Sequence, residues 1–177
     1  RDRLYATVNW LGRSFSIIDA GGIEVVCDVD ENQKISPHFT IKELANNKAK
    51  DDIKFISTPR SRKFLRMVEE FRKRRSPVKG INVTSNYRTK SFNSATPNAD
   101  PKSRHLDAEA LDWWIGVVSA NDYNLLARDW ENICILFGEV GAINFYTHGV
   151  HIEIGSDISY GAKGFSIRDY RGTKADW

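Results

Sequence analysis

The chain has little of what holds small disulfide-rich or membrane proteins together. It contains two cysteines among 177 residues and no run of 18 apolar residues. Cys27 and Cys134 each lie in an apolar run, which predicts buried thiols and neither a disulfide framework nor a cysteine zinc site. Without a long apolar run, no membrane-spanning helix is expected. Residues 1–4 lead into a mixed polar stretch, so no signal peptide is expected within this chain.

An excess of one charge is also missing, because 26 basic and 23 acidic residues leave a net charge of +3. This mild charge suits an anionic polymer such as a cell wall without selecting it. The densest basic run, residues 72–75, ends a predicted helix, where cations are favoured by the helix dipole. The aromatic and glycine pattern of an RNA-binding sheet is absent, so no nucleic-acid partner is expected. Nothing in the sequence indicates an oligomeric state.

Apolar residues make up 41% of the chain, enough to build one core. Residues 4–30 hold three β-rich runs, broken by Gly12 and by the pair Gly21 and Gly22, which predicts a hairpin or meander. Ser36–Pro37 marks the join to the rest. Residues 1–34 are therefore predicted as an N-terminal β extension, and residues 35–177 as the main domain.

The main domain alternates between helical and extended patterns. Helices are predicted over residues 40–46, 58–75 and 121–137 from capping signals and apolar stripes. Strands are predicted over residues 80–85 and 111–118, one or two more over 142–154, and a polar loop over 89–103. This order predicts an α+β fold in which helices flank a small antiparallel sheet.

Histidine is scarce, with four in the chain, and two of them stand near acids. His105, Asp112 and His151 offer the two imidazoles and one carboxylate that suit a catalytic zinc ion with one open position. His105 and Asp112 are seven residues apart, so they converge only if His105 ends a loop and Asp112 lies on the following strand. On spacing alone, a metal site and hydrogen-bonded structural histidines are about equally favoured.

His151 belongs to the alternating run of residues 150–154, which predicts a half-buried strand. A period of two places His151 and Glu153 on one face and the three aliphatic residues on the other. Glu153 is therefore expected beside the metal. Trp113 and Trp114 precede the apolar residues 115–118; core packing is the expected role of the pair, with a groove-lining role open for one ring.

Four segments together resemble the D-alanyl-D-alanine carboxypeptidase family of zinc peptidases. Residues 103–112 resemble its Ser-x-His-x-x-Gly-x-Ala-x-Asp signature, and residues 83–88 its strand ending in Ser-x-Tyr-Arg. Residues 35–44 resemble the segment before its first helix, and residues 149–153 its second metal-binding strand. The family includes phage endolysin peptidases and shares its fold with the hedgehog signalling domain. The likeness covers roughly residues 35–155, with its parts in the family's order.

The resemblance implies that Zn²⁺ is held by His105, Asp112 and His151. It further implies that Arg88 binds a carboxylate or carbonyl of the substrate and that Ser103 lies near the metal or the substrate. The activity implied is that of a carboxypeptidase or endopeptidase acting on peptidoglycan stem peptides. Such a protein is expected outside the cell, at the cell wall or in a phage particle.

The sequence departs from the family pattern at three places. Residues 94–99 replace a glycine-rich turn, and Ala108 stands where the family usually has glycine. Many members carry a catalytic acid three residues before the last histidine ligand, where this chain has His148. Glu153 is the first choice for the general base and His148 the second. If neither serves, the chain is a non-catalytic zinc-binding, structural or cell-wall-binding domain of the same fold.

Overall fold

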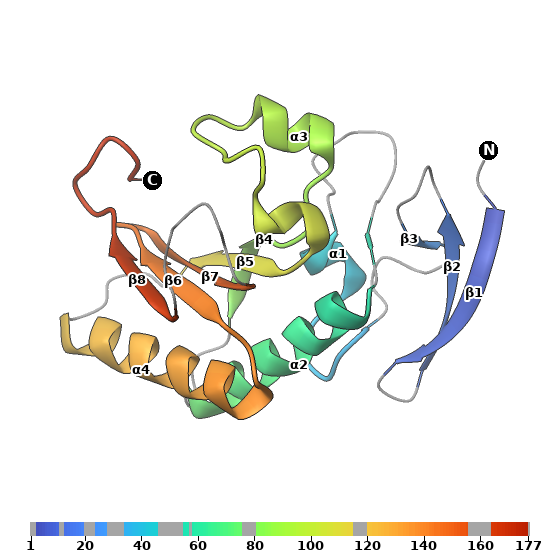
Figure 1. Cartoon of the computed structure of the whole chain (residues 1–177), viewed down its shortest axis with the longest axis horizontal. Helices are drawn as coiled ribbons and strands as arrows, with labels where there is room; N and C mark the ends of the chain where they lie inside the picture. Colours follow the sequence, from blue (N-terminus) through green and yellow to red (C-terminus); the bar gives the residue numbers. More distant parts are fainter. Residues whose placement is uncertain are drawn as a thin grey trace.

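A computed structural model describes residues 3–10, 13–19, 24–27, 34–45, 55–56, 58–75, 81–114, 120–155 and 164–176 (Figure 1). Its main sheet has five strands in the order β4-β5-β7-β6-β8. These are β4 (Asn82–Ser85), β5 (Ala110–Trp114), β6 (Gly141–Phe145), β7 (Gly149–Ile154) and β8 (Ser166–Asp169). Neighbouring strands are antiparallel except β6 and β8, which run parallel. The predicted α+β class is confirmed, and the sheet is mixed through its last strand.

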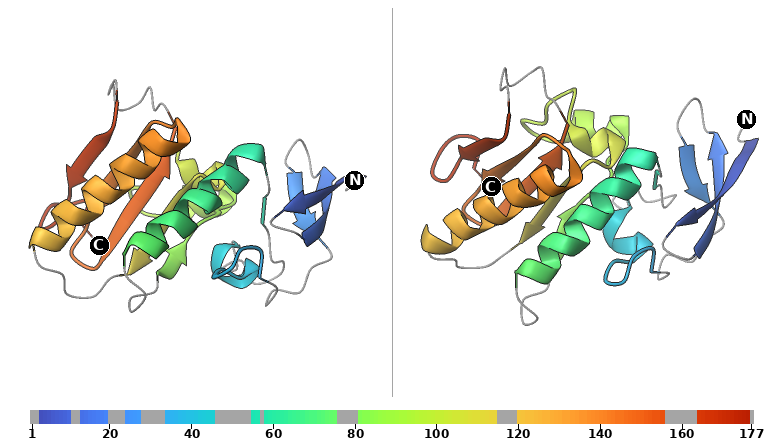
Figure 2. Two further views of the ribbon diagram at one scale, coloured as in Figure 1. Left: turned by 90° about the horizontal axis from the view of Figure 1, so that it is seen from below. Right: turned by 60° about the horizontal axis from the view of Figure 1, so that its bottom comes forward.

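Helices lie on both sides of this sheet. They are α1 (Ile41–Leu44), α2 (Pro59–Arg74), α3 (Lys90–Ala95), the short 3₁₀ helix η1 (Arg104–Asp107) and α4 (Ala120–Phe137). The two long helices, α2 and α4, lie next to each other under one face, while α3 and η1 lie above the other (Figures 1 and 2). The sheet therefore has a helix-covered face and a face that only short elements approach.

Helix α2 shows why the sequence folds this way. Thr58 caps it through a reciprocal pair of hydrogen bonds with Ser61, and Pro59 occupies the first turn, where its missing N–H costs nothing. The predicted apolar stripe is buried in the core. Phe64 and Phe71 meet the Trp130 ring of α4 edge to face, with ring centroids 5.9 and 5.6 Å away. Such aromatic pairs add roughly 0.5–1.5 kcal/mol each beyond the burial of their surface.

Strand β7 divides its residues between the two faces as the period predicts. Val150, Ile152 and Ile154 are fully buried in the core. Each contributes roughly 1.5–3 kcal/mol through removal from water. His151 and Glu153 point to the opposite face, where the titratable side chains gather. A shift of register by one residue would exchange the two sets, so core burial fixes where the imidazole points.

Three regular elements of the main domain were not expected from the sequence, and the 3₁₀ helix η1 is one of them. The predicted loop 89–103 contains α3, which Thr89 caps by accepting the N–H of Phe92. The tail contains β8, which pairs with β6 at the edge of the sheet. The expected surface pair in this tail is present, because Arg171 Nη2 lies 2.7 Å from Asp169 Oδ2.

A second sheet is formed by β1 (Arg3–Trp10), β2 (Arg13–Asp19) and β3 (Glu24–Cys27), an antiparallel meander at the right of Figure 1. The three predicted N-terminal strands are thus present. A separate extension over residues 1–34 stays a prediction. Within the described part of the chain, no helix has both the length and the apolar character needed to cross a membrane.

Candidate metal centre

Three separate elements bring His105, Asp112 and His151 together. Asp112 on β5 lies directly opposite His151 on β7, so both side chains leave the same face of the sheet. His105 belongs to η1, which runs into β5. One potential ligand atom from each residue lies within 4.8 Å of the others. Asp112 lies on the strand that follows His105, as predicted, but His105 belongs to a 3₁₀ helix where the end of a loop was expected.

His105 presents one ring nitrogen to the cluster. Its Nδ1 lies 2.6 Å from the backbone carbonyl of Asn86, and a carbonyl oxygen only accepts, so Nδ1 carries the proton. The buried Nε2 is then an acceptor, 3.1 Å from Asp112 Oδ2, without a hydrogen-bond partner among the described residues. Burial lowers the pKa of His105 and keeps it neutral, against the opposing pull of Asp112. A neutral imidazole fixed through its far nitrogen is the form that binds metal.

Asp112 joins the two histidines and an arginine. Its Oδ1 lies 2.7 Å from His151 Nδ1, and its Oδ2 accepts from Nη2 of Arg88 at 2.7 Å. Burial would raise the pKa of Asp112, but the two neighbouring imidazoles, above all the protonated and hydrogen-bonded His151, outweigh burial and hold that pKa well below its usual value. The carboxylate is therefore ionised and able to serve as a metal ligand.

His151 lies between two carboxylates. Its Nε2 is 3.5 Å from Glu153 Oε2, on the side away from Asp112. Burial lowers the pKa of His151, but Asp112 and Glu153 more than reverse this and raise it to about 10. In the absence of a metal, the imidazole is thus protonated, because the two carboxylates favour a positive charge between them. A metal ion must displace that proton to bind, which couples metal affinity to pH.

Glu153 and His148, the two candidates for the base, occupy different surroundings. Glu153 is buried beside His151, and its Oε1 has no hydrogen-bond partner among the described residues. His148 is exposed in the turn between β6 and β7. It precedes His151 by three residues, which corresponds to about 10 Å along an extended backbone. The next residue back, Thr147, donates its N–H to Asp176 at 2.7 Å. The structure thus brings Glu153 to the cluster and leaves His148 on the surface.

Arg88 and Ser103 both lie near the ligands, in different ways. Arg88 is largely buried, and besides Asp112 its Nε donates to Ser85 at 3.0 Å. Its backbone N–H donates to the carbonyl of His105 at 3.0 Å, which ties the end of the β4 segment to η1. Ser103 caps η1 by accepting the N–H of His105 at 3.3 Å. Ser103 therefore positions a predicted ligand through the backbone.

Two further residues on this face were not named as site residues from the sequence. Asn144 of β6 lies opposite His151 and is buried, and the signal for it is a lone amide in the apolar run of residues 141–145. Trp114 is half exposed two residues after Asp112, opposite Gly149, whereas Trp113 is fully buried in the core. Of the two roles left open for the pair, Trp113 packs the core and Trp114 stands on the site face.

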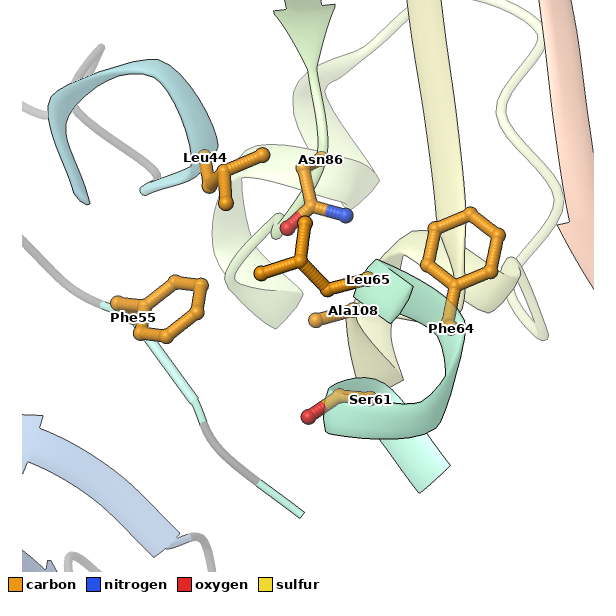
Figure 3. A pocket seen from close by; sticks show the side chains of 7 residues that line it. All are labelled: Leu44, Phe55, Ser61, Phe64, Leu65, Asn86 and Ala108. Atoms are coloured by element: carbon orange, nitrogen blue, oxygen red, sulfur yellow. The ribbon is translucent and has the colours of Figure 1, made fainter. Parts of the chain in front are cut away.

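A small pocket lies behind the cluster, between α1 and α2 (Figure 3). Leu44, Phe55 and Leu65 form much of its wall, with Asn86 and Ala108 at the side of η1. None of the metal-cluster residues lines it. Its apolar wall and its place among core residues make it a feature of packing, distinct from the face that carries His151.

The residues present suit zinc. Two imidazoles and one ionised carboxylate are the ligand set that leaves an open position for chemistry. The unpartnered Nε2 of His105 is a buried acceptor that faces another acceptor, Oδ2 of Asp112, at 3.1 Å, and a cation between them would satisfy both. His105 is oriented by a backbone carbonyl and Asp112 by an arginine, the kind of outer support that metal ligands have.

The family Peptidase M15 matches residues 37–153, which include every residue of the cluster. Short stretches are similar to GTPase Der of Streptococcus sanguinis strain SK36 (70% identity over 30 residues), of Streptococcus gordonii strain Challis (67% over 30) and of Desulfitobacterium hafniense strain DCB-2 (61% over 36). These matches cover 17–20% of this chain and 6–8% of those proteins. No solved structure matches. On the match over residues 37–153, about two thirds of its length, the chain belongs to the peptidase M15 family.

Proposed function

We propose that this chain is a zinc peptidase that hydrolyses the stem peptides of peptidoglycan. His105, Asp112 and His151 hold the ion, and Glu153 is the general base. The observation that carries the proposal is the buried convergence of these four side chains on one sheet face, in a chain of the M15 family. We place its site of action outside the cell, at a cell wall or in a phage particle, because the substrate is there.

Zinc held by these residues would supply Lewis-acid chemistry for the scissile carbonyl and would lower the pKa of a bound water toward ~7. The protein supplies the proton transfers. Glu153 takes a proton from the attacking water on one carboxylate oxygen and delivers it to the leaving amine. Its unpartnered Oε1 is the free acceptor for this task, while Oε2 faces His151.

Arg88 has two tasks in this proposal. Nη2 and Nε hold Asp112 and Ser85, which fixes the ligand carboxylate in place. Nη1 can then donate to a carbonyl or carboxylate of the substrate on the β4 side of the site, since a guanidinium has five N–H donors. Ser103 supports the site by holding η1.

The alternative is a domain of the same fold that binds zinc or cell wall without cleaving it. One observation favours it: position 148, where many relatives carry the catalytic acid, holds an exposed histidine. The two functions differ in turnover, since both predict bound zinc.

The test combines metal analysis of the purified chain with digestion of muropeptides followed by mass spectrometry. We expect about one zinc per chain and cleaved stem peptides. Glu153→Gln should keep the zinc and lose about 10²-fold or more in rate, the usual scale of acid–base catalysis. His148→Ala is the matched control and should stay near wild type. A zinc-loaded wild type that is inert on muropeptides supports the binding domain and rejects the peptidase.

A further inference from the structure

Asn144 is a buried polar side chain in a strand that is otherwise apolar. It is 5% exposed, and its Oδ1 has no hydrogen-bond partner among the described residues. A buried polar atom left unpaired costs about 1–3 kcal/mol. Native structures rarely retain such an atom without a reason. One such reason is a bound ligand that supplies the missing hydrogen bond.

The strand register places Asn144, with its unpartnered Oδ1, next to the metal cluster. The strand register aligns one residue from each strand across the site face: Ser85, Asp112, His151, Asn144 and Arg168. Paired side chains leave the same face, and neighbouring strands are about 4.8 Å apart. Asn144 therefore lies beside His151 on the side away from Asp112, and Arg168 follows on the edge strand β8.

The far end of this row is built from ordered side chains. Nη1 of Arg168 donates to the hydroxyl of Tyr170 at 3.2 Å. The Tyr170 ring stacks on Tyr146, with ring centroids 5.4 Å apart. All three side chains are half-buried. The backbone of Arg168 thus lies about two strand spacings, or roughly 10 Å, from that of His151, and Tyr170 orients the guanidinium.

We propose that Asn144 binds a peptide group of the substrate and that Arg168 binds a carboxylate beyond it. A side-chain amide offers one acceptor and a donor group, the complement of a peptide C=O and N–H. A guanidinium pairs with a carboxylate through directed N–H bonds. An extended chain advances about 3.4 Å per residue, so the carboxylate lies two to three residues from the scissile bond.

This inference rests on the proposed peptidase function and specifies its substrate. Arg88 stands at the opposite end of the row, bound to Asp112. The substrate therefore crosses the strands, with the metal cluster between two arginines. The class we infer is an extended peptide with an acidic group on the β8 side. Asn144 is a binding residue here, and Arg168 determines specificity.

The test uses two series of peptides that differ only by a carboxylate or a carboxamide two or three residues from the cleaved bond. Arg168→Gln should raise KM about 10-fold for the carboxylate peptides and leave the carboxamide peptides unchanged, because the lost interaction is a ground-state ion pair. Arg128→Gln on α4 makes the same charge change on the helix side and is the matched control. Equal effects on both series would overturn the assignment of Arg168.

Asn144→Leu keeps the number and branching of the side-chain heavy atoms and removes the amide. We expect KM to rise about 10-fold on every peptide, with kcat and zinc content near wild type, because uniform binding is lost. Its thermal unfolding midpoint should not fall, since no internal hydrogen bond is broken. A lowered midpoint with unchanged KM would show a structural asparagine and overturn the proposal.

Binding separates this inference from the peptidase proposal. The zinc-loaded Glu153→Gln variant is titrated calorimetrically with the carboxylate peptide to measure its affinity. Adding Asn144→Leu or Arg168→Gln to this variant should weaken that affinity about 10-fold. Peptide binding without cleavage by the wild type would reject catalysis and keep the subsite. Cleavage that both variants leave unaltered would keep catalysis and overturn the subsite. A wild type that neither binds nor cleaves the peptides overturns both.

Discussion

Two groups of carboxylates with little exposure differ in how their charges are paired. One is the metal cluster of His105, Asp112, His151 and Glu153. The other is an ion-pair network in which Glu139 accepts from Lys63 at 2.9 Å and from Arg60 at 3.1 Å. Arg60 also donates to Glu109 at 3.1 Å. In the network, carboxylates face cations that extend from α2 into solvent.

Within the described part of the chain, the network leaves one buried acceptor without a hydrogen bond, Oε2 of Glu109, but Nη1 of Arg104 lies 3.6 Å from it, whereas the metal cluster leaves two. His105 Nε2 and Glu153 Oε1 are buried without partners among the described residues, and Arg88 is the one permanent cation that the structure places on the cluster. Burial of unpaired acceptors raises the free energy of the folded chain, and the core beneath β5 and β7 compensates for it. Charge content alone therefore does not mark a site. Acceptors that face each other do, because they define the place of a missing positive charge.

The largest effect we expect is loss of the metal from His151→Ala. Removal of one of three ligands should lower bound zinc from about one equivalent to a small fraction. Loss of a residue that only supports a ligand already costs about 10–100-fold in metal affinity, and loss of a ligand should cost more. Glu139→Gln in the ion-pair network should keep its zinc. Metal analysis after gel filtration decides between them. One equivalent of zinc on His151→Ala would remove His151 from the ligand set.

The second effect concerns pH in the metal-free chain. The pKa of His151 is raised to about 10 in the fold, above its unfolded value of about 6.5. The stabilisation is therefore complete below pH ~6.5 and is lost as pH rises toward 10. Urea unfolding in the presence of a chelator should show a free energy of unfolding that falls by about 1 kcal/mol or more per pH unit between 6.5 and 8.5.

Zinc reverses this dependence, because the ion replaces the proton. Zinc-saturated protein should become more stable over the same pH range as competition from protons fades. The range stops at pH 8.5 because a second group titrates above it. Burial raises the pKa of Cys134 to about 12 in the fold, so at higher pH the thiol ionises only in the unfolded chain, and the folded state loses stability for that reason as well. A metal-free chain whose stability rises from pH 6.5 to 8.5 would contradict the proton held by His151.

The sequence predicts the features that local patterns control. The α2 stripe, the Thr40 and Glu43 capping box and the alternation in β7 each arise from neighbours in sequence, and each is present. The family signatures add the convergence of His105, Asp112 and His151, which spacing alone leaves undecided. Within the described residues, these signals suffice for the fold class and for the geometry of the cluster.

What the sequence did not show depends on distant partners. Strand β8 is short and half exposed, and it is extended because β6 offers an open edge. Helix α3 has six residues and a single cap at Thr89, too little for a period to emerge. Asn144 gains its meaning from the register of β6 against β7, which places it opposite His151. Register is a tertiary property, so no local pattern reveals it.

A smaller effect is expected when the ion-pair network is broken. Glu139→Gln removes a buried carboxylate, but its partners Arg60 and Lys63 are 48% and 31% exposed and return to water. The free energy of unfolding should fall by about 1 kcal/mol at low salt and by less at 1 M salt. Urea unfolding at both salt concentrations tests this. A loss without salt dependence would mean that packing, not charge, holds Glu139.

The smallest effect tests the turn that leads from His105 to β5. Ala108 stands where the family usually has glycine, and its backbone is left-handed, with φ 54° and ψ 32°. Such a conformation costs a residue with a Cβ roughly 1–2 kcal/mol. Ala108→Gly removes that cost. It also loses a buried methyl group worth about 0.8 kcal/mol and adds roughly 0.4–1 kcal/mol of unfolded-state entropy.

These opposing contributions nearly cancel, so Ala108→Gly should change the free energy of unfolding by less than about 0.5 kcal/mol and leave zinc binding intact. Ala127→Gly in α4 is the matched control, because Ala127 is also buried but helical. It should lose about 2 kcal/mol, since helix propensity and the methyl group are both lost with no strain to relieve. Urea unfolding of the two variants therefore isolates the cost of the left-handed turn. Equal losses would show that Ala108 bears no strain, and that the departure from glycine at the metal site costs the fold nothing.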